Sequence, residues 1–385
     1  MKELLRDVPV PEEREAEERG WRVVRAAFDA LPARRRQPGR SRWLVALAAG
    51  ILILAIGLSP AGAKVADLVR DVIHPGEENA RPKLTSLPTA GRLLVTSPQG
   101  AWVVAEDGAK RLLGGYEDAT WSPQGLFVAV TKGHELTAVE PDGTVRWSLP
   151  AHRPVSDPVW APSGIRIAYR AGKSVRVVAG NATDDHLLAR RAAPTPPAWA
   201  PDSDRNVLAF VDSSGRVRAV DVESGQTLWR SARFGGSVQS LQWSATGRLL
   251  VMARSFFVTL DPRGEAIAKG PIGGSVEAAA FSPDGNVLAL ARRTGVRSEL
   301  ELMRTGSAGS SQRRLIAKPG RFTDIAWSPD GSWILVAWRD ADQWLFVRPD
   351  DGKIIAVSDI SRQFAPGTAR AARFPRVAGW CCAPG

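Results

Sequence analysis

The side chains that most often perform chemistry are few in this sequence and lie far apart. No G-x-S-x-G nucleophile elbow, P-loop or dinucleotide-binding motif occurs. Three aspartates lie in turns, where turn formation is the usual role and Ca²⁺ binding the alternative; they are Asp202, Asp284 and Asp330. The histidines occupy four separate places without a metal-site spacing: His74, His134, His152 and His186. We therefore predict a protein that is not an enzyme and has no catalytic, cofactor-binding or metal site.

The only two cysteines, Cys381 and Cys382, are adjacent and lie near the end of the chain. Two neighbouring cysteines cannot form a zinc site or a disulfide framework by themselves. We expect two small residues in a closing strand. The alternative is a disulfide bond between the neighbours, which a location outside the cytoplasm would allow.

The chain is basic, because 51 lysines and arginines face 40 aspartates and glutamates and give a formal net charge of +11. A charge of this sign permits attraction to anionic lipid headgroups or acidic wall polymers. The arginines are scattered along the sequence, which disfavours a nucleic-acid partner.

An uncharged stretch over residues 43–63 is long enough to cross a membrane, for which about 20 apolar residues are needed. Five arginines lie between residues 34 and 42, whereas acidic residues balance the basic ones just after the stretch. The positive-inside rule then places residues 1–42 in the cytoplasm and the rest of the chain outside. We expect an uncleaved signal anchor; the Ala61-Gly62-Ala63 sequence leaves a cleaved signal peptide as the alternative.

Residues 12–31 form a predicted amphipathic helix in the cytoplasmic part. Its apolar stripe consists of Trp21, Val24, Phe28 and Leu31. The stripe either lies on the inner leaflet or docks a cytoplasmic partner. On the other side of the membrane, residues 64–90 are expected to form a juxtamembrane helix followed by a polar, proline-containing linker.

From residue 91 onward one phrase recurs: an aromatic residue, a small residue, a Pro- or Gly-containing turn and then an apolar strand. The aromatic residues are spaced by 39, 39, 44, 38, 46 and 53 residues, a period typical of propeller blades. Ser, Pro and Gly each suit one position of a tight turn, and a large aromatic residue at the same place in every repeat would fill the contact between blades. These structural repeat anchors are Trp121, Trp160, Trp199, Trp243, Phe281, Trp327 and Trp380.

The Trp-Ser-Pro-Asp-Gly phrase, as at residues 327–331, resembles the repeat of TolB-like, WD40-like bacterial β-propellers, and the resemblance covers about residues 91–385. The Trp-Asp dipeptide of eukaryotic WD40 repeats does not occur. The periplasmic protein that gives the family its name is soluble and has an α/β domain before its propeller, so the resemblance implies a fold and not that protein's partners.

The two ends of the repeat region are complementary. Before Trp121 there is room for three strands, at about residues 92–96, 101–105 and 110–113, and residues 376–380 have no strands after them. We therefore predict an all-β, seven-bladed propeller that is closed by its N- and C-terminal strands, with six blades as the alternative. The expected domains are 1–42, 43–63, 64–90 and the propeller at 91–385.

The predicted function is that of a membrane-anchored, non-enzymatic binding or scaffold protein of the bacterial cell envelope. One propeller face would bind a protein or an anionic envelope polymer. The first alternative is a transmembrane signalling regulator with the layout of an anti-sigma factor. The second is an envelope enzyme, a lyase or glycan-acting hydrolase, with its site in the propeller channel; the predicted inner strands carry only scattered acids and no histidine, which counts against it.

Overall fold

A computed structural model describes residues 83–201, 205–271, 273–304, 312–366 and 373–382. The predicted cytoplasmic helix with Trp21, Val24, Phe28 and Leu31 and the predicted membrane span at 43–63 lie outside these ranges. Within them, no helix has both the length and the apolar character that a membrane span requires.

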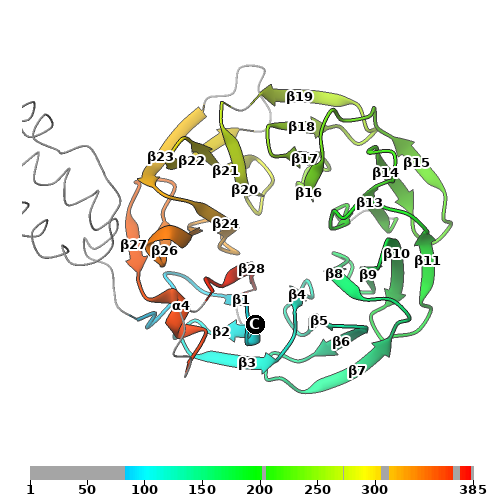
Figure 1. The fold of residues 1–385 in the computed structure, drawn as a ribbon, viewed down its shortest axis with the longest axis horizontal. Helices are drawn as coiled ribbons and strands as arrows, with labels where there is room; N and C mark the ends of the chain where they lie inside the picture. The colour runs from blue at the N-terminus through cyan, green and yellow to red at the C-terminus, as the bar shows by residue number, and fades with distance from the viewer. Residues whose placement is uncertain (1–82, 202–204, 272, 305–311, 367–372, 383–385) are drawn as a thin grey trace, which may run out of the picture. The chain divides into compact units, whose positions relative to one another are not determined.

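Seven four-stranded antiparallel sheets are arranged as blades around a central axis (Figure 1). The predicted seven-bladed propeller is confirmed, and the alternative of six blades is wrong. Blade 1 joins the two ends of the propeller: from the inside outward it consists of β28 (Arg376–Cys381), β1 (Arg92–Ser97), β2 (Gly100–Val104) and β3 (Lys110–Gly114).

Each of the other blades consists of four consecutive strands, of which the first is the innermost and the last the outermost. Blade 2 has β4 (Asp118–Trp121), β5 (Val128–Lys132), β6 (Glu135–Val139) and β7 (Val145–Pro150); blade 3 has β8 (Val155–Trp160), β9 (Arg166–Ala171), β10 (Ser174–Ala179) and β11 (His186–Ala189); blade 4 has β12 (Ala198–Trp199), β13 (Val207–Val211), β14 (Val217–Asp221) and β15 (Thr227–Arg230). Blade 5 has β16 (Val238–Trp243), β17 (Leu249–Ala253), β18 (Phe256–Leu260) and β19 (Ala266–Pro271); blade 6 has β20 (Ser275–Phe281), β21 (Val287–Thr294), β22 (Arg297–Arg304) and β23 (Gln312–Pro319); blade 7 has β24 (Phe322–Trp327), β25 (Ile334–Trp338), β26 (Gln343–Val347) and β27 (Ile354–Val357).

The repeated turn phrase folds as its residue types require. In blade 2 the amide of Gly125 donates a hydrogen bond to the Ser122 carbonyl (2.9 Å), and the Ser122 hydroxyl accepts one from the amide of Phe127 (2.9 Å). Gly125 has φ +66°, a conformation that favours glycine. The same bonds recur around Ser328 in blade 7. These turns therefore fix the connection from the innermost strand to the second strand of their blades.

The apolar core lies between the blades. At the junction of blades 7 and 1 it contains Trp344, Phe346, Trp380 and the ring of Phe364, which follows the short helix α4 (Ile360–Gln363). Leu84 and Leu87 are also buried in this cluster. Both residues belong to the segment that was predicted as a linker. The described part of that segment therefore packs on the propeller.

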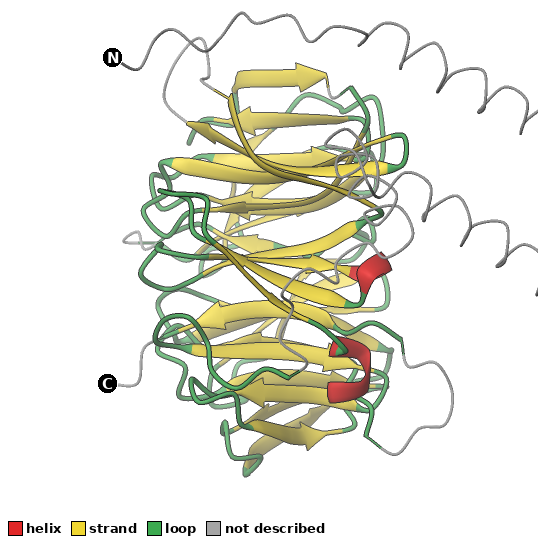
Figure 2. Ribbon diagram, turned by 90° about the vertical axis from the view of Figure 1, so that its left-hand side faces the viewer, coloured by secondary structure: helices red, strands yellow, loops and turns green. Residues whose placement is uncertain are grey.

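The loops gather on two opposite faces of the ring (Figure 2). The turn face carries the loops that join the first to the second and the third to the fourth strand of each blade. The crossover face carries the loops that join the second to the third strand, and those that lead from one blade to the next. The crossover face includes α4 and the 3-10 helix η1 (Arg339–Ala341).

Candidate functional site: a basic face with a groove across three blades

Three of the repeat anchors link their blade to the one before it by a hydrogen bond. The indole N–H of Trp199 donates to the Val159 carbonyl (2.9 Å), and that of Trp327 donates to the Ala280 carbonyl (3.0 Å). Trp243 makes the equivalent bond to Ala198 (3.2 Å). In each case the acceptor is the residue just before the preceding anchor, so these side chains have a structural role in the ring.

The remaining anchors have other contacts. The indole N–H of Trp160 donates to Gly164 in its own turn (2.9 Å), and the ring of Trp380 lies against Phe346 with 5.7 Å between ring centroids. The guanidinium of Arg92 lies 5.0 Å from the ring centroid of Trp121. Phe281 is buried and has no polar group to satisfy.

Four acids lie on the inner strands near the crossover face: Asp118, Asp157, Glu277 and Asp324. Asp118 accepts a hydrogen bond from the backbone amide of Asp157 in the next blade (3.2 Å), and Asp157 is paired with Arg170 (3.1 Å). Burial raises the pKa of Asp324, an effect that the positive charge of Arg376 opposes. Asp118 and Asp157 therefore hold neighbouring strands together. The described residues contain no cluster of three or more His, Cys, Asp or Glu that is suited to a metal ion.

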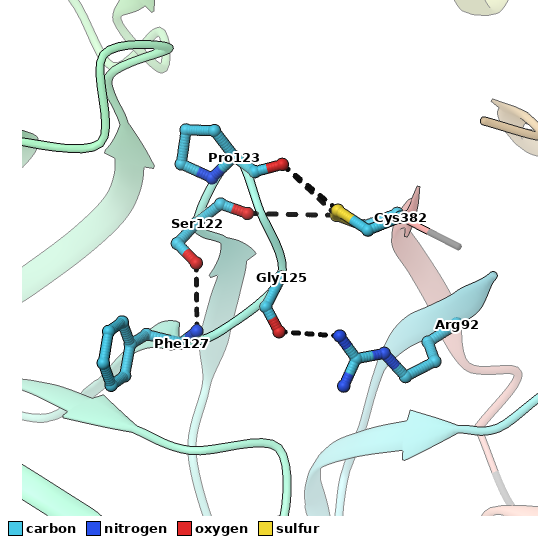
Figure 3. The surroundings of a disulfide bond; sticks show 7 residues. Arg92, Ser122, Pro123, Gly125, Phe127 and Cys382 are labelled. Carbon is cyan, nitrogen blue, oxygen red and sulfur yellow. Dashed lines mark hydrogen bonds between the residues drawn. A yellow bond between two sulfur atoms is a disulfide. The ribbon is translucent and has the colours of Figure 1, made fainter. Parts of the chain in front are cut away.

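Cys381 and Cys382 form a disulfide bond in the structure. The expectation of two unlinked small residues is wrong, and the alternative holds. The bond lies at the end of β28, beside the first repeat turn (Figure 3). Close by, Arg92 donates a hydrogen bond to the Gly125 carbonyl (2.7 Å), and the Sγ atom of Cys382 lies 3.1 Å from the Pro123 carbonyl. Both ends of the propeller therefore contact the same turn of blade 2.

The two loop faces carry opposite charge, a feature that the linear sequence conceals. Of the described loop residues on the crossover face, eleven are basic, namely Arg153, Lys173, Arg190, Arg191, Arg216, Arg233, Arg254, Arg321, Arg339, Arg362 and Arg373. Five are acidic, namely Glu117, Asp212, Asp340, Asp342 and Asp359.

On the turn face the balance is reversed. Its described loops hold five basic residues, Arg205, Arg248, Arg263, Arg348 and Lys353. They hold thirteen acidic ones, Glu106, Asp107, Glu140, Asp142, Asp184, Asp185, Glu223, Asp261, Glu265, Asp284, Asp330, Asp350 and Asp351. Arginines that are scattered in the sequence therefore converge on one face, because successive loops alternate between the two faces.

The crossover face is hollowed by a groove of about 1080 Å³ that crosses blades 3, 4 and 5. Lys173, Arg191 and Arg233 line it, each from a different connection. All three side chains are exposed, and none forms an ion pair with a described residue. The groove therefore presents uncompensated positive charge to solvent.

The single acid of the groove, Asp212, is engaged by its own turn. Its Oδ1 atom accepts hydrogen bonds from the hydroxyl (2.6 Å) and amide (2.9 Å) of Ser214, and Oδ2 lies 3.6 Å from Arg230. Burial alone would raise the pKa of Asp212, but the bonds from Ser214 and the amide of Arg216 and the charge of Arg230 outweigh it and lower that pKa. At neutral pH Asp212 is therefore a carboxylate that stabilises its own loop. Most of its hydrogen-bond acceptor capacity is already used by these contacts.

No protein-family model matches the chain, and no curated protein is similar to it in sequence. Solved structures share its fold. A chain of hydrazine synthase from Kuenenia stuttgartiensis is similar with a TM-score of 0.50 and 15% identity, over 60% of this chain and 76% of that chain. A chain of a mitotic checkpoint complex gives 0.52 and 17%, over 63% and 77%. KlHsv2 with loop 6CD replaced by a Gly-Ser linker gives 0.53 and 11%, over 69% and 93%. At these identities the similarity shows the β-propeller fold alone.

Proposed function

We propose that the protein is a non-enzymatic binding module of the bacterial cell envelope, held by a membrane anchor at residues 43–63. Its crossover face engages an anionic partner, either a protein or an envelope polymer. The observation that carries the proposal is the segregation of charge between the two faces, with an open groove on the basic one. A rigid ring with such a face suits binding, because little conformational entropy is lost when a partner docks.

Several features support the envelope setting. The uncharged stretch and the arginines before it suit a signal anchor with the propeller outside. The bonded pair Cys381–Cys382 suits an oxidising compartment. The repeat phrase resembles that of TolB-like bacterial propellers, which adds weight to an envelope role.

The proposal is tested by photo-cross-linking in intact cells. A photoreactive amino acid replaces Ser213, which lies exposed in the groove, or Ala245, which lies exposed on the turn face. We expect a specific adduct from position 213 and a much weaker one from position 245. An adduct that forms equally well from both positions, or only from position 245, would contradict the assignment of the binding face.

A further inference from the structure

We infer that the groove across blades 3, 4 and 5 binds a short acidic peptide segment that also carries apolar side chains and belongs to a partner protein. This inference rests on the proposed function, because it names the chemistry of the partner for the same face. It is carried by three properties of the groove: its charge, its apolar floor and its rigidity.

The charge selects an anionic partner. Lys173, Arg191 and Arg233 reach the groove from three separate connections, and none is neutralised by a described acid. The one carboxylate at the site, Asp212, is already bonded to Ser214. Carboxylates of an incoming peptide would therefore find cations with free hydrogen-bonding capacity, and arginine binds a carboxylate with two parallel bonds.

The floor selects a peptide over a phosphate polymer. Val211, Val238 and Ala192 line the groove but are themselves buried. The apolar surface that solvent reaches comes from Ala193, Pro194 and Phe234. The half-buried ring of Phe234 is stacked on Phe256, with 6.3 Å between the ring centroids. A phosphodiester or polyphosphate chain satisfies the cations but has no apolar side chain to cover this floor. An acidic peptide with leucine-like residues satisfies both.

The walls are held in place before any partner arrives. The amide of Ala192 donates to the Lys173 carbonyl (2.8 Å), and that of Ala193 donates to the Val211 carbonyl (2.8 Å). The hydroxyl of Thr195 donates to the Val238 carbonyl (2.9 Å). These bonds tie residues 190–197 to the connection that holds Lys173 and to the strands β13 and β16. A preformed site costs less ordering free energy on binding.

The size suits several residues of extended chain. Ligand pockets for drug-sized molecules typically measure about 300–1,000 Å³, and this groove, at about 1080 Å³, is slightly larger. It is also open to solvent and not enclosed, so a peptide segment can reach it from the surface.

The test uses the full chain in nanodiscs and fluorescein-labelled probe peptides. One peptide alternates Glu with Leu; its matched control alternates Glu with Ser and has the same charge. We expect the Glu–Leu peptide to bind more tightly than the Glu–Ser peptide. The double variant Arg191→Glu/Arg233→Glu should weaken its binding by roughly tenfold or more, as expected for loss of close charge pairs.

The matched protein control is Arg339→Glu/Arg362→Glu, which reverses two exposed charges on the same face but near blade 7. It should leave the affinity for the Glu–Leu peptide within about twofold, because the altered charges are distant and screened. Circular dichroism and the thermal transition of each variant show whether it is folded.

Equal binding of the two peptides would overturn the inference. So would displacement of the Glu–Leu peptide by inorganic polyphosphate at equal charge concentration, or no binding of either peptide to the folded wild-type protein. Equal weakening by the two double variants would also overturn it, because the whole face and not the groove would then be responsible. In each of these cases an adduct from position 213 in cells would still support the broader function, so the two failures can be told apart.

Discussion

Leu93, in the first strand of the propeller, lies directly opposite Trp380, in its last strand. This pairing of β1 with β28 continues to Thr96 opposite Arg376 and gives blade 1 its innermost strand. The inner edge of β1 is therefore paired at the point where the chain enters and leaves the ring.

Removal of residues 376–385 should open the ring. Leu93, Leu94 and Val95 are fully buried in the intact protein, and without β28 they would lie on an exposed strand edge that favours aggregation. We expect a loss of cooperative unfolding and concentration-dependent aggregation, measured by thermal unfolding and light scattering. Removal of residues 383–385 alone serves as the control. A soluble, cooperatively folded protein without residues 376–385 would contradict closure by the C-terminal strand.

The indole bonds of the repeat anchors can be measured by a matched pair of substitutions. Trp327 donates its N–H to Ala280, whereas the buried N–H of Trp380 has no hydrogen-bond partner among the described residues. Both Trp327→Phe and Trp380→Phe reduce side-chain volume, but only the first removes a hydrogen bond. The free energy of unfolding should fall by about 1 kcal/mol more for Trp327→Phe, the usual net value of such a bond. A larger loss for Trp380→Phe in denaturant titrations would show that the bond is not the deciding contact.

The segment before β1 is fastened to blade 7 by an acid-sensitive contact. Thr89 donates a hydrogen bond to Asp330 (2.8 Å). Partial burial raises the pKa of Asp330, but bonds from Ser328, Ser332 and Thr89 outweigh it and lower that pKa well below its ordinary value of 3.8. A lowered folded-state pKa stabilises the protein above the unfolded-state value, and this contribution is lost as the pH falls through the folded-state pKa.

Asp330→Asn should therefore be less stable than the wild type at neutral pH, and the difference should shrink in acid. Urea unfolding at neutral and acidic pH measures this change. The exposed Asp350, also on the turn face, provides the control substitution Asp350→Asn, which should be close to neutral. A stability difference for Asp330→Asn that stays constant down to strongly acidic pH would show that ionisation of Asp330 is not its cause.

The bond between Cys381 and Cys382 predicts a simple mass difference. Protein isolated without reductant should be lighter by two hydrogens than the same protein after reduction. The comparison is made on the C-terminal peptide by mass spectrometry, with thiols blocked during lysis. Identical masses before and after reduction, with both thiols blocked, would show that the pair is not bonded in the cell.

Much of the fold was predictable because each repeat is defined by the conformational preferences of a few neighbouring residues. The Ser-Pro-x-Gly turn and the aromatic residue before it fix the position of each innermost strand, and the unmatched ends of the repeat region predicted the composite blade. The predicted strand at residues 376–380 corresponds to β28, Arg376–Cys381.

The candidate site was not predictable in the same way. Lys173, Arg191 and Arg233 are far apart in the sequence and meet only because successive connections return to the same face. The groove also depends on β12, which has only two residues, so that residues 190–197 cross blade 4 as a long connection. The burial of Leu84 and Leu87 depends on packing against blades 7 and 1, which a polar, proline-containing sequence does not reveal. Summing the charges of every second loop along the sequence would have predicted the basic face.

The most direct test of the account compares partner capture by two charge-reversed proteins. One carries Lys173→Glu, Arg191→Glu and Arg233→Glu on the crossover face; the other carries Asp107→Lys, Asp142→Lys and Asp351→Lys on the turn face, all exposed positions. Quantitative cross-linking and mass spectrometry in cells measure the yield of the partner obtained with the wild type. We predict that capture is lost in the first protein and retained in the second. Capture that survives in the first and disappears in the second would contradict the assignment of binding to the basic face.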